Sequence, residues 1–114
     1  MELVAIFTRK APEEIKTATA VPVVPASEVL DWKDKIDVMI ICGGSATDLP
    51  EQTPHYAQYL NVVDSFDTHA KIPAHFAAVD AASRAAGTVS LISCGWDPGL
   101  FSLARIYSHF FFLK

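Results

Sequence analysis

The sequence predicts an α/β fold built on a doubly wound parallel sheet, and three observations lead to it. Short apolar runs, typical of buried strands, alternate along the chain with longer segments that are typical of helices. The apolar runs carry no polar alternation, as expected of parallel strands covered on both faces. Polar or Gly-rich loops follow several of these runs, at the carboxyl strand ends where open α/β sheets bind ligands.

The first part of the chain predicts two strands and a short helix before a central strand. Residues 3–7 (LVAIF) have the pattern of a buried strand, and residues 17–24 (TATAVPVV) that of a short edge strand, because prolines interrupt them. Residues 26–32 favour one or two helical turns capped by Ser27. Residues 36–42 (IDVMIIC) form the most apolar run and are expected to be the central strand.

The second part alternates more regularly. A helix is expected over residues 49–61, where Pro50 is tolerated in the first turn. A short strand (62–66) and a helix (72–87) follow, and Gly87 is expected to end that helix as its C-cap. A last strand and a last helix are expected over residues 88–93 and 98–112.

Length and composition are those of one globular domain. The chain has 114 residues, of which 51% are hydrophobic and 19% charged, and its formal net charge is −4. This charge argues against nucleic acid and anionic membranes as partners, because both attract basic surfaces. Cys42 and Cys94 form no C-x-x-C pair, so we expect two buried thiols in a cytoplasmic protein.

The turn that opens a dinucleotide-binding domain is missing. Such a domain begins with a strand leading into G-x-G-x-x-G, whose backbone approaches the pyrophosphate at a helix N-terminus. The 114 residues contain no such motif, and CGGSATD (42–48) does not have its spacing. We therefore interpret residues 1–114 as a partial dinucleotide-binding domain with an incomplete Rossmann-like sheet.

Two strand ends are candidates for cofactor binding. Thr8, Arg9 and Lys10 follow the first strand and offer a hydroxyl and two cations, which suit a 2′-phosphate; the alternative is a solvated basic tip. After residues 36–42, glycines would let the backbone approach a ligand and hydroxyls would bind it, and Asp48 is equally suited to cap the next helix. The residues of this second loop are Gly43, Gly44, Ser45 and Thr47.

Two acidic loops follow the last two strands. Asp67 lies just past residues 62–66, and the alternative there is that Asp67 or Thr68 caps a helix. In GWDPG (95–99), Trp96 offers an apolar wall and Asp97 a carboxylate, with the same alternative of a cap. At neighbouring strand ends the two carboxylates would suit an ammonium group or an amine.

Metal chemistry is not expected. His55, His69, His75 and His109 have no metal-ligand spacing, and His55 and His75 are expected to be surface residues of helices.

Three segments closely resemble meso-diaminopimelate dehydrogenases: LVAIFTRK, CGGSATDLPEQTPHYAQYLNVVDSFDTH and LISCGWDPGLFSLARIYS. The resemblance implies an NADP-dependent enzyme of lysine biosynthesis that deaminates the D-centre of meso-2,6-diaminopimelate oxidatively to L-2-amino-6-oxopimelate. It also implies a cytoplasmic homodimer. It implies that the 2′-phosphate is held by Thr8, Arg9 and Lys10, and the nicotinamide side by Gly44, Ser45, Ala46 and Thr47. The substrate's amino group would be held by Asp67 and Asp97, beside Trp96.

The resemblance also implies that parts of the family's chain are absent here. Family members begin with a strand and its Gly-rich turn, and they continue into a C-terminal substrate and dimerisation domain. We expect the isolated chain to be inactive for this reason. The alternative function is that of a catalytically inactive fragment or an interaction module.

Overall fold

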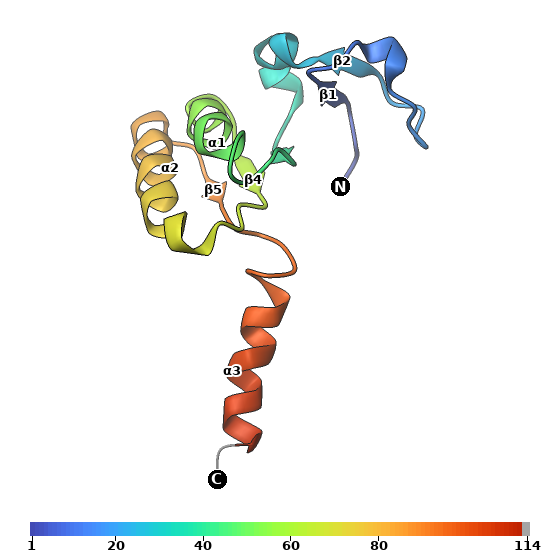
Figure 1. Ribbon diagram of the computed structural model, residues 1–114. Coiled ribbons are helices and arrows are strands. Elements are labelled where there is room, and N and C mark those ends of the chain that lie inside the picture. Colours follow the sequence, from blue (N-terminus) through green and yellow to red (C-terminus); the bar gives the residue numbers. More distant parts are fainter. Residues whose placement is uncertain (113–114) are drawn as a thin grey trace. The chain divides into compact units, whose positions relative to one another are not determined.

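The chain forms two small parallel sheets with helices, in a computed structural model that describes residues 1–112 (Figure 1). The residues divide into two units, one comprising Met1–Asp37 and the other beginning at Val38. Parallel strands joined by helices confirm the α/β class.

The first unit contains a two-stranded parallel sheet. Strand β1 (Ile6–Thr8) pairs with β2 (Val23–Pro25) in a register that places Thr8 opposite Pro25. Two 3₁₀ helices accompany them, η1 (Pro12–Glu14) and η2 (Ala26–Lys35). Burial of Val24 and Val29 gives this unit its small core.

Two predictions for this unit are wrong. The strand begins at Ile6 rather than Leu3, and Leu3 is 52% exposed. The helical turns begin after Pro25, and no side chain caps them, so Ser27 is not the cap. Both errors come from local patterns, which identify apolar or capping residue types but not the neighbours available to them.

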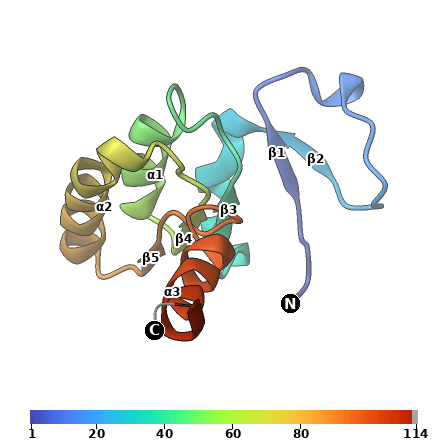
Figure 2. The ribbon, with the colours of Figure 1, turned by 60° about the horizontal axis from the view of Figure 1, so that its bottom comes forward.

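The second unit contains a three-stranded parallel sheet in the order β3 (Met39–Ile41), β4 (Val62–Asp64) and β5 (Ser90–Leu91). Helices α1 (Leu49–Ala57) and α2 (Ile72–Ala86) pack against each other, α1 contacting β3 and β4 and α2 contacting β5 (Figure 2). The apolar core lies between these elements and includes Leu49, Ala57, Leu60, Val62, Phe66 and Val79.

The helices agree well with the sequence patterns. Pro50 lies in the first turn of α1, where its missing N–H costs no intrahelical bond. Gly87 ends α2 in the left-handed conformation, with φ 73°, as expected of a C-cap. Helix α3 (Leu100–Phe112) follows the GWDPG turn. Within residues 1–112, no helix is long and apolar enough to cross a membrane.

Strand β3 is an edge strand, although its apolar run predicted the central one. It pairs with β4 alone, and Ile40 is 57% exposed; β4 is the strand with a partner on each side. Cys42 follows β3 and Cys94 follows β5, the other edge strand of this sheet, and both are exposed. The prediction of buried thiols is therefore wrong, because burial depends on a strand's place in the sheet.

Candidate functional site

The loop after β3 is closed on itself by hydrogen bonds. The carbonyl of Gly44 accepts from the backbone N–H groups of Asp48 and Leu49 at 2.8 and 3.1 Å, and the N–H of Gly44 donates to Asp48 Oδ2 at 2.9 Å. Asp48 stands at the N-cap position of α1, but its side chain makes no capping bond to the helix. Its carboxylate holds the loop instead.

The two glycines of this loop lie in crowded positions, where an added side chain would force its neighbours to move. A Cβ on Gly43 would lie 2.8 Å from Gln52 Oε1, and one on Gly44 would lie 2.6 Å from Thr47 Oγ1. Both separations are shorter than carbon and oxygen tolerate without movement. Because Gly44, Ala46 and Thr47 are exposed, this tightly closed loop presents backbone to solvent.

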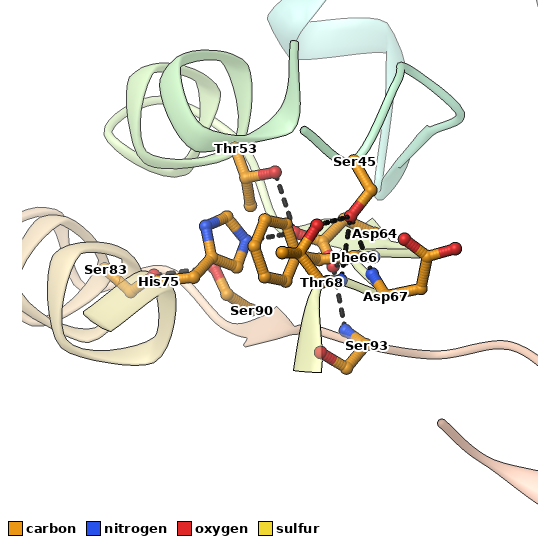
Figure 3. A network of polar contacts seen from close by, with 10 residues as sticks. All are labelled: Ser45, Thr53, Asp64, Phe66, Asp67, Thr68, His75, Ser83, Ser90 and Ser93. Atoms are coloured by element: carbon orange, nitrogen blue, oxygen red, sulfur yellow. Dashed lines mark hydrogen bonds and ion pairs between the residues drawn. The ribbon is translucent and has the colours of Figure 1, made fainter. Parts of the chain in front are cut away.

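Ser45 joins the loop after β3 to the loop after β4 (Figure 3). Its Oγ accepts hydrogen bonds from the backbone N–H groups of Asp67 and Thr68, at 2.8 and 3.1 Å, and lies 3.0 Å from Thr68 Oγ1. Two accepted bonds use both lone pairs of a hydroxyl, so the Ser45 proton is left to be donated to Thr68. All the hydrogen bonds that the Ser45 hydroxyl can make are therefore made within the protein.

Asp67 presents an exposed carboxylate beside this junction. Thr68 is the N-cap residue of η3 (His69–Lys71), which leads into α2, but no side chain caps this helix. The alternative that Asp67 or Thr68 serves as a helix cap is therefore wrong. The backbone of Asp67 is held while its side chain faces outward.

The GWDPG segment forms a closed turn between β5 and α3. The N–H of Gly95 donates to the carbonyl of Pro98 at 3.1 Å, and the Asp97–Pro98 peptide bond is cis. Asp97 Oδ1 accepts from Arg105 Nη2 at 2.8 Å, so its carboxylate is paired with α3. Trp96 is 65% exposed, and its ring meets the ring of Phe101 edge to face.

The basic strand end lies in the first unit. Thr8 ends β1, and its Oγ1 accepts from the backbone N–H of Lys10 at 3.1 Å. Arg9 and Lys10 are both exposed. Two cations thus follow a parallel strand at its carboxyl end, an arrangement compatible with binding a phosphate group and equally with a solvated basic tip.

A buried polar cluster that no sequence pattern predicted lies behind these loops. His75, expected at the surface, is 5% exposed, and its Nε2 lies 2.7 Å from Oδ2 of Asp64, which is 1% exposed. The available signal was that Asp64 and Phe66 fall on the same face at a strand end. Among residues 1–112, no group of three His, Cys, Asp or Glu side chains is placed to hold a metal ion.

Known proteins share both the sequence and the structure of the chain, although no protein-family model matches it. The meso-diaminopimelate D-dehydrogenase of Lysinibacillus sphaericus is 60% identical over 106 residues, which are 93% of this chain and 32% of that protein. A solved mutant of the Clostridium tetani E88 meso-diaminopimelate dehydrogenase, with DAP, has a TM-score of 0.84 at 51% identity and covers 100% of this chain. The resemblance to meso-diaminopimelate D-dehydrogenase is confirmed.

The match extends over only part of these relatives. The chain spans about a third of the length of the curated proteins it matches, and 35% of the solved Clostridium tetani chain. An engineered D-amino acid dehydrogenase solved with NADP+ has a TM-score of 0.83 at 45% identity, and the match covers 96% of this chain and 33% of that chain. The Clostridium tetani neighbour was thus solved with DAP, and the engineered neighbour with NADP+.

Proposed function

We propose that the chain supplies cofactor-binding and amine-binding segments of an NADP-dependent meso-diaminopimelate D-dehydrogenase. The observation that carries the proposal is the placement of three loops. They follow β3, β4 and β5, which are adjacent parallel strands, and they bear Gly44–Thr47, Asp67 and Trp96–Asp97. Carboxyl ends of parallel strands are where open α/β sheets bind ligands. The homodimer and the cytoplasmic location that the resemblance implies belong to the same proposal.

Asp67 and Asp97 are proposed to hold the amino group of the substrate's D-centre. Both residues are exposed, so an ammonium group can reach their carboxylates. The ammonium group first gives up one proton to solvent. The C–H bond at that carbon then breaks, the hydrogen leaves as hydride with the electron pair of the bond, and a C=N bond with positive charge forms. Two fixed carboxylates stabilise that charge as it develops. Water then adds to the C=N carbon and ammonia leaves, giving the 6-oxo product.

The ion pair with Arg105 fits this role for Asp97. Arg105 and Asp97 have side chains 64% and 38% exposed, and ion pairs that open to solvent contribute about 0–1 kcal/mol. The amine of a substrate can therefore replace the guanidinium at little cost. Trp96 would form the apolar wall beside the amine.

The residues present fit NADP at its 2′-phosphate and near its nicotinamide. NADP+ would supply the acceptor for the hydride. Arg9 and Lys10 would hold the phosphate, with Thr8 Oγ1 keeping the backbone of this turn in place. In the loop after β3, Gly44–Thr47 would offer exposed backbone and the Thr47 hydroxyl, because the hydroxyl of Ser45 is already used.

A graft tests the proposal. This chain replaces the matching third of the Lysinibacillus sphaericus enzyme, and the purified graft is assayed for NADP+-dependent oxidation of meso-diaminopimelate. We expect activity, and we expect Asp97→Asn to lower kcat about 100-fold, as loss of one group that stabilises transition-state charge does. Arg9→Ala should raise the KM for NADP+ and leave that for NAD+ unchanged.

Two results would contradict the proposal: a folded graft without activity, or an active graft that Asp97→Asn leaves unaffected. The alternative of an inactive fragment or interaction module draws on α3, whose exposed side chains include Leu103, Ile106, Phe110 and Phe111. That alternative predicts a folded graft with no turnover, so the same assay separates the two.

A further inference from the structure

Asp64 occupies the centre of the second unit. It is the last residue of β4, the middle strand of the three-stranded sheet, and it is 1% exposed. Both its carboxylate oxygens and its backbone carbonyl accept hydrogen bonds from other segments of the chain. Buried polar groups are normally hydrogen-bonded, and the partners of this carboxylate come from several separate segments of the second unit.

One oxygen of Asp64 binds both of the loops that carry the acidic candidates. Oδ1 accepts from the backbone N–H of Phe66 at 3.1 Å, one residue before Asp67, and from that of Ser93 at 2.8 Å (Figure 3). The backbone carbonyl of Asp64 also accepts from the N–H of Cys94 at 2.8 Å. A single residue thus holds the loop after β4 and the second and third residues of the loop after β5, Ser93 and Cys94.

The other oxygen binds the two helices. Oδ2 accepts from Thr53 Oγ1 of α1 at 2.8 Å and lies 2.7 Å from His75 Nε2 of α2. The His75 ring is stacked on the ring of Phe66, with centroids 4.1 Å apart. The helices therefore fix the carboxylate in place, and it cannot rotate without breaking bonds to both of them.

The charge of Asp64 strengthens these bonds. Burial raises the pKa of its carboxyl, but hydrogen bonds from His75, Ser93, Phe66 and Thr53 outweigh this effect and lower the pKa below 3.8. Asp64 is therefore ionised at neutral pH. Hydrogen bonds to an ionised acceptor are about twice as strong as neutral ones.

We propose that Asp64 is a positioning residue that sets the spacing between Asp67 and the Trp96–Asp97 turn by holding both loops on one carboxylate oxygen. The inference rests on the function proposed above and deepens it. Two carboxylates can bind one amine together only if their loops keep a fixed separation. The Asp64 side chain hydrogen-bonds to both of these loops. Ser45 adds a second tie, between Asp67 and the loop after β3.

The first test uses the 114-residue chain and nuclear magnetic resonance. In Asp64→Ala we expect the amide resonances of Phe66 and Ser93 to shift upfield together, since both lose the same acceptor. Asp64→Asn keeps an oxygen without the charge, so both amides should shift in the same direction by less. This second variant decides the matter if Asp64→Ala does not fold. Movement of only one amide, or of neither, would overturn the proposal.

The matched control is Ser83→Ala. Ser83 is buried, and its Oγ shares a 2.6 Å hydrogen bond with Ser90 Oγ, which joins α2 to β5 in the same unit without touching either loop. Ser83→Ala removes a hydrogen bond inside the second unit, as Asp64→Ala does, and therefore also lowers stability. The Phe66 and Ser93 amides should stay in place in this variant.

The second test measures kinetics in the graft described above. We expect Asp64→Ala to lower kcat/KM for meso-diaminopimelate about 100-fold, the cost of a small misplacement of reacting groups, while the KM for NADP+ changes less than about threefold. Asp64→Asn should recover part of the loss. Equal loss for both ligands, or the same loss in Ser83→Ala, would mean a structural role only. An inactive parent graft would refute the proposed function, and the resonance experiment would still decide the role of Asp64.

Discussion

Three aspartates near strand ends differ in what surrounds them rather than in sequence setting. Asp64 is buried, and its carboxylate has four hydrogen-bond partners, two side chains and two backbone N–H groups, whereas Asp67 is exposed and Asp97 pairs with Arg105. The buried carboxylate is therefore committed to the protein, and the exposed ones can exchange their partners for a ligand. Asp64 is thus suited to position the loops, and Asp67 and Asp97 are suited to bind the amine of a substrate.

The pH dependence of stability should report the ionisation of Asp64. Its pKa is lower in the folded chain than the ordinary value of 3.8, so its contribution to the free energy of unfolding is complete above that value. The contribution is lost as pH falls through the lower, folded-state pKa. Urea unfolding followed by circular dichroism should show a steeper loss of stability below about pH 4 in the parent chain than in Asp64→Asn. Parallel curves for the two proteins would contradict this assignment.

Among the elements, the turns restrict which residue type can be accommodated more strictly than the helices do. Helix α2 ends at Gly87, where no atom lies within 4 Å of the position that a Cβ would occupy. Gly99 has φ 135° and closes the GWDPG turn, and a Cβ there would overlap the carbonyl oxygen of Gly95. The two glycines share a positive φ but differ in the space around them.

Substituting alanine at these two glycines should separate backbone conformation from crowding. Gly87→Ala is expected to destabilise the chain by about 1 kcal/mol, the cost of a left-handed conformation for an L-residue. Gly99→Ala carries the additional overlap with Gly95 and should cost about 3 kcal/mol or more. Unfolding midpoints in urea measure both. Equal midpoints for the two variants would show that the turn can relax around the added methyl group.

At the scale of the whole molecule, the two sheets leave strands with few partners. Among the described residues, β1 pairs with β2 alone in the first unit, and β3 pairs with β4 alone in the second. Helix α3 in turn exposes most of its large apolar side chains. The chain spans about a third of the length of the curated proteins it matches.

The 114-residue chain by itself should therefore show no NADP+-dependent oxidation of meso-diaminopimelate. It contains no G-x-G-x-x-G turn to bind the pyrophosphate, so NADPH should bind weakly at most. NADPH fluorescence follows both turnover and binding. Turnover that disappears in Asp97→Ala would contradict the first expectation. Saturable micromolar binding that Arg9→Ala weakens would contradict the second.

The α/β class, the three α-helices and the turn residues Pro50 and Gly87 could be predicted because each depends on a local pattern. The candidate residues at strand ends were found in the same way, and the family resemblance was carried by continuous motifs. Local signals of this kind need no knowledge of the strand order.

Only the tertiary structure decided that β3 is an edge strand, that Cys42 and Cys94 are exposed, and that His75 is buried against Asp64. It also assigned the hydroxyl of Ser45 to the Asp67 loop and paired Asp97 with Arg105. The physical reason is that each of these facts depends on which segments become neighbours. An apolar run indicates a strand but not its place in the sheet, and a polar residue's partner can lie 29 positions away, as Ser93 does from Asp64.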